Sequence, residues 1–531
     1  MEHGWLSILP PLLAIGLALI TRQVVLSLLL GVWVGALVLT GGNPLTALQR
    51  VGDTYLVNAL ADRSHAAIIL FSTTLGGMVG ILSRSGAMEG IVDALSRRVR
   101  SRRSGQTVTA VMGLAIFFDD YANTLLVGNT MRPLTDRLHI SREKLAYLVD
   151  STAAPVTTIA IISTWVGFEV GLIQDSLSRL AQEGSGYLFF LRSLPYNFYP
   201  ILTLAMVFLV AGTGRDFGPM AKAEGRAAGG ELLRPGAQPA ADPMALARVA
   251  DEAGPASPLL AAIPIATVVV LTVVGLWWHG RHELMMRGEA ADSLREILNA
   301  ADSLAVLMWS SLGGSLVAIA LSVGARRLDL SGSVDAWLDG ARAMLIAMVI
   351  LILAWALGAV CDGLGTGPWL VDVSRDVLSP HLLPAISFLL AAAMSFSTGT
   401  SWGTMAILIP IILPLADALP ADGGVTAQLR DVIALSSTSA VLAGAVFGDH
   451  CSPISDTTIL SSMASGSDHV DHVRTQLPYA LAAAGAAVCI GYLPAGFGVS
   501  PWISLAGGAA LLAGLLRWRG RRAPPVLGAD R

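Results

Sequence analysis

Long stretches without a charged side chain recur along this chain. Each is close to or above the length of about 20 apolar residues that crosses the hydrocarbon core of a bilayer as a helix. These stretches are Gly4–Thr21, Gln23–Gln49, Ala66–Ser83, Ser193–Gly214, Ser257–Trp278, Ser303–Ala325, Ala343–Cys361 and Thr475–Leu516. The chain is also only 14% charged, against about 25% in soluble domains. We therefore expect a membrane protein with many spans.

The start of the chain and its cysteines add two expectations. Met1–His3 lack the basic leader of a signal peptide, so the segment Gly4–Thr21 is expected to remain as the first span. The three cysteines, Cys361, Cys451 and Cys489, have neither a disulfide nor a metal-binding spacing. We therefore expect no cofactor.

The two halves of the chain repeat similar elements on either side of a polar stretch, Arg215–Glu252. A Gly-rich span end comes first in each half. The segments Ala115–Leu138 and Met394–Leu419 follow, and both end in the pattern Pro-Leu-x-Asp-x-Leu. Each is followed by a span with a polar, Pro-containing interruption, at Asp150–Thr158 and at Gly448–Thr458. Because three elements recur in the same order, we interpret the halves as an internal duplication.

Basic residues orient the two copies. Arginine and lysine side chains gather on both sides of Gln106–Met131, so a single crossing would leave one group outside, against the positive-inside rule. A re-entrant hairpin that enters from the cytoplasm and turns near Asp119–Thr124 removes this conflict. The matching segment, roughly 382–419, has few basic neighbours and is expected to enter from the periplasm.

The expected fold is an all-α polytopic membrane protein. It holds two inverted repeats with re-entrant hairpins and broken helices, in about eleven full spans plus two hairpins. The expected divisions are an N-terminal membrane half (1–214, with repeat 1 at about 66–172), a solvated cytoplasmic linker (215–256), a C-terminal membrane half (257–517, with repeat 2 at about 343–460) and a cytoplasmic tail (518–531). The N-terminus is expected in the periplasm and the protein in a bacterial inner membrane.

Acidic side chains within the predicted membrane segments concentrate at the duplicated breaks, together with hydroxyl and amide groups. An acid inside hydrocarbon costs free energy and by default marks an ion or proton path, and broken helices expose carbonyl oxygens that bind cations. We therefore expect an ion- or substrate-binding site, with sodium held by Asp449, Asp456 and Asp120. The expected site residues are Asp119, Asp120, Asn123, Thr124, Asp150, Ser151, Thr152, Ser397, Thr398, Thr400, Ser401, Asp449, His450, Ser452, Ser455, Asp456 and Thr457.

Several of these side chains have an alternative interpretation. Serine and threonine in a span often bond a backbone carbonyl or pack helices. Asp136 and Asp417 fall at hairpin ends and are expected to be surface caps. Glu169 stays open between an interfacial position and a place on the ion path. His450 stays open between a packing residue and a proton-linked switch, because the pKa of imidazole lies near neutrality.

One motif resembles a known family. The stretch FGDHCSPISDTTILSS, Phe447–Ser462, is similar to the signature of the NhaC-type sodium/proton antiporter family. The first-half stretches FFDDYANTLLVGNTMRPLTDRL and DSTAAPVTT resemble the corresponding motifs, and the likeness covers roughly 60–495. The resemblance implies an ion-transporter fold of two inverted repeats that couples sodium to proton movement. Some relatives exchange organic acids or move other solutes, so the resemblance limits the mechanism more than the substrate.

The resulting hypothesis is a secondary active transporter that exchanges sodium for protons by alternating access. The predicted midplane segments hold several acids and no lysine or arginine, which suits a cation. The alternative is a sodium- or proton-coupled carrier of a small organic solute, such as an amino acid, organic cation or carboxylate. An enzyme is not expected, although Gly448–Asp449 in a span is also found in intramembrane aspartyl proteases. The expected partners are membrane lipid, sodium and protons, with an organic solute and a homodimer left open, and no nucleic acid.

Overall fold

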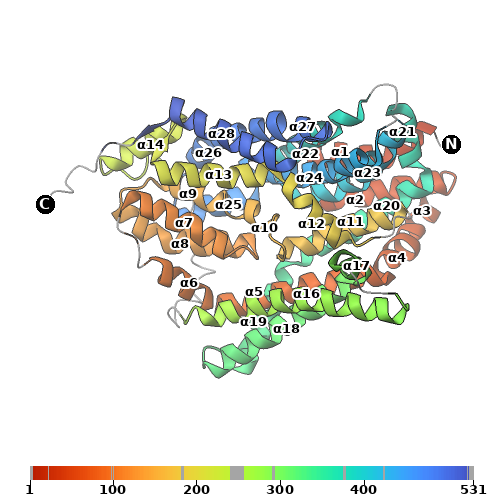
Figure 1. Cartoon of the computed structure of the whole chain (residues 1–531), viewed down its shortest axis with the longest axis horizontal. Helices are drawn as coiled ribbons and strands as arrows, with labels where there is room; N and C mark the ends of the chain where they lie inside the picture. The colour runs from red at the N-terminus through yellow and green to blue at the C-terminus, as the bar shows by residue number, and fades with distance from the viewer. Residues whose placement is uncertain are drawn as a thin grey trace.

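The computed structural model describes residues 4–21, 23–96, 99, 101–180, 184–239, 256–289, 293–374, 378–422, 425–522 and 524. The chain is almost entirely helical (Figure 1). The N-terminal half contains α1 (Leu9–Thr21), α2 (Val24–Leu39), α3 (Pro44–Arg50), α4 (Val57–Ala61), α5 (Arg63–Arg84), α6 (Ala87–Ser96), α7 (Arg102–Ala115), α8 (Asp120–Arg137), α9 (Arg142–Asp150), α10 (Ala154–Thr157), α11 (Thr164–Arg179), α12 (Gly186–Ser193) and α13 (Phe198–Thr213).

The rest of the chain begins with a short strand. Its elements are β1 (Arg215–Asp216), α14 (Gly218–Ala228), α16 (Leu259–Met286), α17 (Leu294–Ala300), α18 (Ser303–Gly324), α19 (Leu330–Ala343), α20 (Leu345–Leu364), α21 (Thr366–Ser374), α22 (Leu383–Thr398), α23 (Ser401–Asp422), α24 (Ala427–Cys451), α25 (Asp456–Ser465), α26 (His469–Ala486), α27 (Leu493–Gly496), α28 (Pro501–Arg519) and β2 (Arg521–Arg522).

Fewer helices are long enough to cross a bilayer than the sequence predicts. Within the described residues, length and composition identify nine such helices, or up to ten if the bent pair Gly186–Tyr196 and Phe198–Thr213 forms one span. Two of the nine, Pro380–Thr398 and Ser401–Leu419, are the arms of the second predicted hairpin. The predicted number of about eleven full spans is therefore not reached. One reason is that α2 has only 16 residues, although the uncharged run around it is longer.

Both halves present the same order of elements. A long helix (α5 or α20) is followed by a short one (α6 or α21), a helical pair (α7–α8 or α22–α23), a further helix (α9 or α24) and a break before α11 or α25. This order is the one that the internal duplication predicts. The α7–α8 pair is a hairpin, because Glu224 contacts Arg102 at its beginning and Ser141 just after its end.

The two halves dock on each other in a crossed manner. Helix α25, after the break in the second half, packs against α8 and α9 of the first half. Helix α11, after the break in the first half, packs against α23 of the second half, where the rings of Trp165 and Phe168 lie 5.1 and 4.6 Å from that of Trp402. Each broken span is thus held by the other half's hairpin.

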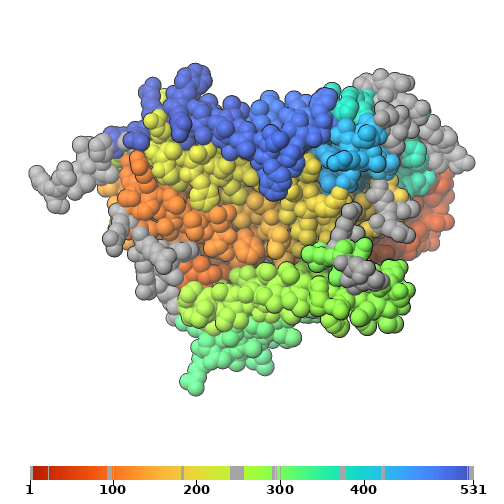
Figure 2. Space-filling model, in the orientation of Figure 1, coloured from red at the N-terminus to blue at the C-terminus, as the bar shows by residue number. Residues whose placement is uncertain are grey.

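A separate layer of long helices lies along one side of the molecule, formed by α5, α16, α18 and α19 (Figure 1). Helices α5 and α19 approach closely because glycines lie at their crossing: a Cβ atom on Gly340 would lie 2.2 Å from the carbonyl oxygen of Gly76. The outer face of α16 exposes apolar side chains, including Val270, Val274 and Trp278, and forms a continuous layer at the bottom of Figure 2. Such a face is suited to lipid.

The beginning of the predicted linker is folded. Strand β1 pairs with β2 near the C-terminus, and α14 packs on α9 and α26. Asp216 accepts hydrogen bonds from Lys144 and Tyr479, and Arg226 donates to both oxygens of Glu143 at 2.7 and 2.9 Å. Residues 215–228 are therefore not solvated chain, because ion pairs fix them to the first half and a hydrogen bond from Tyr479 fixes them to the second. Residues 240–255, and most of the tail after 522, lie outside the described residues.

The crossed docking of the two halves is open to a direct test at Gly128 of α8. A Cβ atom at this position would lie 2.6 Å from the Cβ of Ala464 in α25. Gly128→Leu should therefore separate the halves and lower the thermal unfolding temperature, since overpacking a buried contact costs about 1–3 kcal/mol. The matched control is Gly514→Leu in α28, where nothing lies within 4 Å. Equal unfolding temperatures of the two variants would contradict the described docking.

Candidate functional site

The tip of the first hairpin is shaped by a helix cap. Asp119 precedes α8, and its Oδ1 accepts a hydrogen bond from the backbone N–H of Ala122 at 2.8 Å, the ordinary arrangement of an N-cap aspartate. The N–H of Thr164 at the start of α11 donates to the carbonyl of Phe118 at 2.9 Å. The tip is therefore held against the beginning of α11, with Asp119 and Asp120 in the interior.

Asn123 holds three backbone segments together. Its amide nitrogen lies within 2.7–3.2 Å of the carbonyl oxygens of Gly113, Ile116 and Thr152. These carbonyls belong to the end of α7, the hairpin tip and the break after α9. The amide oxygen of Asn123 has no hydrogen-bond partner. The sequence predicts a ligand at this position, and the structure shows that its nitrogen is already engaged in holding the break open.

Asp449 connects the second break to the second hairpin. It lies in the last turn of α24, and its carboxylate accepts hydrogen bonds from Ser455 and, at 3.2 Å, from Ser401. Ser455 belongs to the non-helical residues between α24 and α25, and Ser401 begins α23 just after the hairpin tip. Thr457 lies 2.9 Å from Ser455, hydroxyl to hydroxyl. Four predicted residues and Thr458 therefore meet in one network, since Thr458 donates to the Asp449 carbonyl at 3.1 Å.

Asp456 joins this network to the first hairpin through a residue that the sequence analysis did not select. The hydroxyl of Tyr121 donates to the carboxylate of Asp456, and the N–H of Thr457 donates to the other oxygen at 2.9 Å. Tyr121 directly follows Asp120 in the FFDDYAN stretch, so its position beside the acids was visible. Its phenol is not among the predicted site groups, which are carboxylates, the hydroxyls of serine and threonine, amides and the imidazole of His450.

Four carboxylates share this region, which we call the carboxylate cluster: Asp119, Asp120, Asp449 and Asp456. Asp120 is 1% exposed, and the negative charges of the other three act on it. One of its oxygens has no hydrogen-bond partner, and neither has the hydroxyl of Thr124. Within the described part of the chain, no lysine or arginine forms an ion pair with these acids. Asp119, Asp120 and Asp449 are buried, whereas Asp456 is exposed. The mutual repulsion of the three buried carboxylates favours neutralisation by a cation or by protons.

The described residues contain no group of three His, Cys, Asp or Glu side chains that could hold a metal by themselves. Hydroxyl and carbonyl oxygens near Asp449, Asp456 and Asp120 would therefore have to complete a shell for sodium. Such oxygens are the donors that hard cations prefer. The chemistry of the donor set suits sodium better than a transition metal, which favours nitrogen and sulfur ligands.

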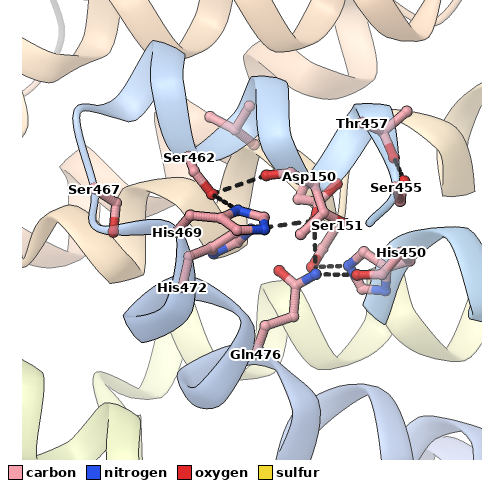
Figure 3. A network of polar contacts seen from close by, with 12 residues as sticks. Asp150, Ser151, His450, Ser455, Thr457, Ser462, Ser467, His469, His472 and Gln476 are labelled. Carbon is pink, nitrogen blue, oxygen red and sulfur yellow. Dashed lines mark hydrogen bonds and ion pairs between the residues drawn. The ribbon is translucent and has the colours of Figure 1, made fainter. Parts of the chain in front are cut away.

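A second polar network lies beside the carboxylate cluster and holds three predicted residues (Figure 3). Asp150 pairs with His472 at 3.2 Å and accepts from the amide of Gln476 at 2.6 Å. His450 lies between Ser151, 2.9 Å from its Nε2, and the hydroxyl of Tyr199, 2.6 Å from its Nδ1. Both nitrogens of this buried ring therefore have hydrogen-bond partners, as a packing residue in the interior requires. His472 and Gln476 were missed because α26 showed no break in its sequence.

The remaining predicted hydroxyls bond backbone carbonyls. Ser397 and Thr398 bond carbonyls one turn earlier in α22, and Thr152 bonds that of Leu148. Ser452 bonds the carbonyl of Phe396, 2.7 Å away, and thereby ties the second break to α22. The hydroxyl of Thr400 accepts from Gly403 at 3.4 Å. These contacts stabilise the hairpin and the breaks.

Three acids outside the predicted set have clear partners. Asp136 pairs with Arg142 at 2.6 Å, and Asp417 pairs with Arg430 at 2.8 Å, as expected of caps at hairpin ends. Glu169 is fully buried and accepts a hydrogen bond from Thr158 at 2.6 Å. Its side chain therefore faces the protein interior.

A large open cavity of about 1280 Å³ lies away from the carboxylate cluster. Its lining contains both signs of charge, including Arg192, Arg287, Arg430, Asp417 and Asp431. Arg192 and Arg430 already pair with Asp431 and Asp417. The cavity and the cluster are therefore separate features, joined through α23 and α24, which contribute residues to both.

Comparison with known proteins gives one family match and a set of relatives. A family model described as the Na+/H+ antiporter family matches residues 156–497. An uncharacterized protein of Haemophilus influenzae is 34% identical over 517 residues, 96% of this chain and 94% of that protein. The Na(+)/H(+) antiporter NhaC of Alkalihalophilus pseudofirmus is 30% identical over 140 residues, 26% of this chain and 28% of that protein. The malate-2H(+)/Na(+)-lactate antiporter of Bacillus subtilis is 31% identical over 141 residues, 26% of each.

Among solved structures, MtrF of Neisseria gonorrhoeae, from a class of antimetabolite efflux pumps, has a similar fold. The TM-score is 0.54 at 13% identity, with 90% of this chain and 87% of that chain covered. At so low an identity the likeness concerns the fold alone. It accounts for nearly the whole length of the chain.

The contrast between Asn123 and its neighbour Thr124 provides a test of the site geometry. Asn123→Ala removes an amide that bonds three buried carbonyls, so it should lower the free energy of unfolding by about 1–3 kcal/mol. Thr124→Val keeps the shape and removes a hydroxyl without a partner, so stability should change little. Thermal unfolding of both purified variants measures the difference. A Thr124→Val variant that is the less stable of the two would contradict the assignment.

Proposed function

This chain belongs to the Na+/H+ antiporter family, as its signature predicts, and from that premise we propose that it exchanges sodium for protons by alternating access. The family is one of membrane transporters rather than enzymes, and the many apolar helices indicate a multi-pass membrane protein. The proposed location is the bacterial inner membrane, with the N-terminus in the periplasm and the C-terminus in the cytoplasm. The observation that carries the proposal is the carboxylate cluster, whose four acids form no ion pair with a lysine or arginine of the described residues.

The cluster can exchange sodium for protons because either cation can neutralise its negative charge. Sodium would be held by Asp449, Asp456 and Asp120, completed by hydroxyl and carbonyl oxygens. When sodium leaves, protons on the same carboxylates relieve their repulsion. Burying ionised carboxylates without a bound cation costs free energy. The protein is therefore expected to change its open side mainly when sodium or protons are bound. This is the condition for exchange rather than leak.

Alternating access follows from where the cluster lies. Its residues come from the first hairpin and from the broken span of the second half, with Tyr121 of the first hairpin bonded to Asp456 of the second half. Movement of these paired elements against the layer of α5, α16, α18 and α19 would open the site to one side and then the other. The proposed inverted relation of the two halves supplies two equivalent end states for this movement.

A second candidate function is sodium-coupled exchange of small carboxylates. The observation that favours it is the relative described as a malate-2H(+)/Na(+)-lactate antiporter. The arginines of the large cavity are compatible with a carboxylate near the path, although two of them already pair with acids. Transport driven by malate, lactate or an amino acid in vesicles separates this candidate from sodium/proton exchange.

The carboxylates themselves give the first functional prediction. Asp449→Asn and Asp120→Asn keep the side-chain shape and remove the charge, so each should abolish sodium-dependent proton movement in proteoliposomes. Asp431→Asn is the matched control: its pair with Arg192 is about half exposed, and such pairs contribute little. Exchange at the normal rate in either cluster variant would remove that residue from the site.

Competition gives a second prediction. If sodium and protons share the carboxylates, lowering the pH protonates the ligands and weakens sodium binding. The dissociation constant for sodium should rise by about tenfold per pH unit for each competing proton. Calorimetric titration with sodium chloride at several pH values measures this slope, with choline chloride as the blank. Sodium binding that is flat in pH but depends on an added carboxylate would favour the second candidate.

A further inference from the structure

An acid–imidazole pair lies in the interior next to the carboxylate cluster. Asp150 ends α9, and His472 belongs to the first turns of α26; they meet at 3.2 Å with side chains 1% and 0% exposed. Gln476, one turn after His472, donates to the same Asp150 oxygen at 2.6 Å. The three side chains point toward one another from two helices (Figure 3).

This group has unused hydrogen-bonding capacity. The second oxygen of Asp150, the Nδ1 of His472 and the amide oxygen of Gln476 are all buried without a partner. Each of these atoms can therefore take one further donor or acceptor, such as a proton.

The pair is separate from the carboxylate cluster but mechanically joined to it. Asp150 and His472 bond each other and Gln476, while Asp449 bonds Ser401 and Ser455. Gln476 also donates to the carbonyl of His450, the residue after Asp449, so both groups hold the end of α24. The titratable groups whose charges reach Asp150 are Asp449, His450 and Cys451 from α24, Tyr199 from α13 and His472 from α26.

A second buried ion pair involves the same helix, α9, and can be compared with the Asp150–His472 pair. Lys144 of α9 pairs with Asp216, and both are almost fully buried. The two pairs differ in their chemistry, because an imidazole ring can accept as well as donate a proton, whereas an ammonium group only donates. If the ring of His472 is neutral, Asp150 is a buried carboxylate without a counter-ion.

We propose that the Asp150–His472 pair is a proton-binding site of the transport cycle, distinct from the carboxylate cluster that takes sodium. This inference rests on the proposed exchange of sodium and protons. One proton binds to the pair, which makes it neutral overall, and the proton leaves to water when the pair becomes accessible. Gln476 joins the pair to the end of α24. Binding of sodium at Asp449 therefore changes, through that helix, how tightly the pair holds its proton.

Proton release on sodium binding tests this assignment. Sodium chloride is added to the purified protein in weakly buffered detergent solution between about pH 6 and pH 9, and a pH-indicator dye reports released protons. Sodium affinity is measured in parallel by calorimetry. Asp150→Asn and His472→Gln should each release about one proton fewer per sodium bound than the unmodified protein. Both should keep their sodium affinity at the alkaline end.

His469→Gln is the matched control. His469 is on the same helix and its ring is bonded to Ser462 and to the carbonyl of Pro453, outside the pair. This variant should release as many protons as the unmodified protein. Undiminished release in both test variants, or loss of sodium binding in both, would overturn the proton site. Absence of sodium binding to the unmodified protein would instead overturn the proposed function itself.

Discussion

The structure depends on one constraint: negatively charged carboxylates are placed in the protein interior, where little water can solvate them. Four carboxylates lie near the tip of the first hairpin and the break before α25, and three of them, Asp119, Asp120 and Asp449, are buried away from water. The protein compensates with hydroxyl groups, helix N-termini and backbone N–H groups rather than with lysine or arginine. These donors stabilise the carboxylates partly, and a mobile cation must supply the rest.

The crossed docking of the two halves follows from the same constraint. A broken helix leaves backbone groups without intrahelical partners, and they need protein around them. The break before α25 is covered by the first hairpin, and α11 begins against that hairpin and packs along the second. Each half therefore supplies the surroundings that the other half's irregular backbone requires. Neither half would form its part of the site alone.

The sequence predicted the class, the duplicated order of elements and most of the carboxylate cluster, because apolar runs and intramembrane acids are local signals. It did not predict Tyr121, His472 or Gln476. Their role depends on which helices meet, and no spacing along the chain records that α26 lies beside α9. The predicted count of about eleven spans is not confirmed, and an uncharged run such as Gln23–Gln49 does not reveal where its helix ends. Likewise, the charges of 215–228 look solvated in sequence but are paired across the fold.

The folded beginning of the connection between the halves has a mechanical consequence. Helix α14 is attached to α9 through the Arg226–Glu143 ion pair and packs on α26, and these two helices carry the Asp150–His472 pair. If the helices around the carboxylate cluster moved relative to the layer of α5, α16, α18 and α19, then α14 would move together with α9 and α26. The polar helix that begins the connection between the halves is therefore part of the same packed unit as the Asp150–His472 pair.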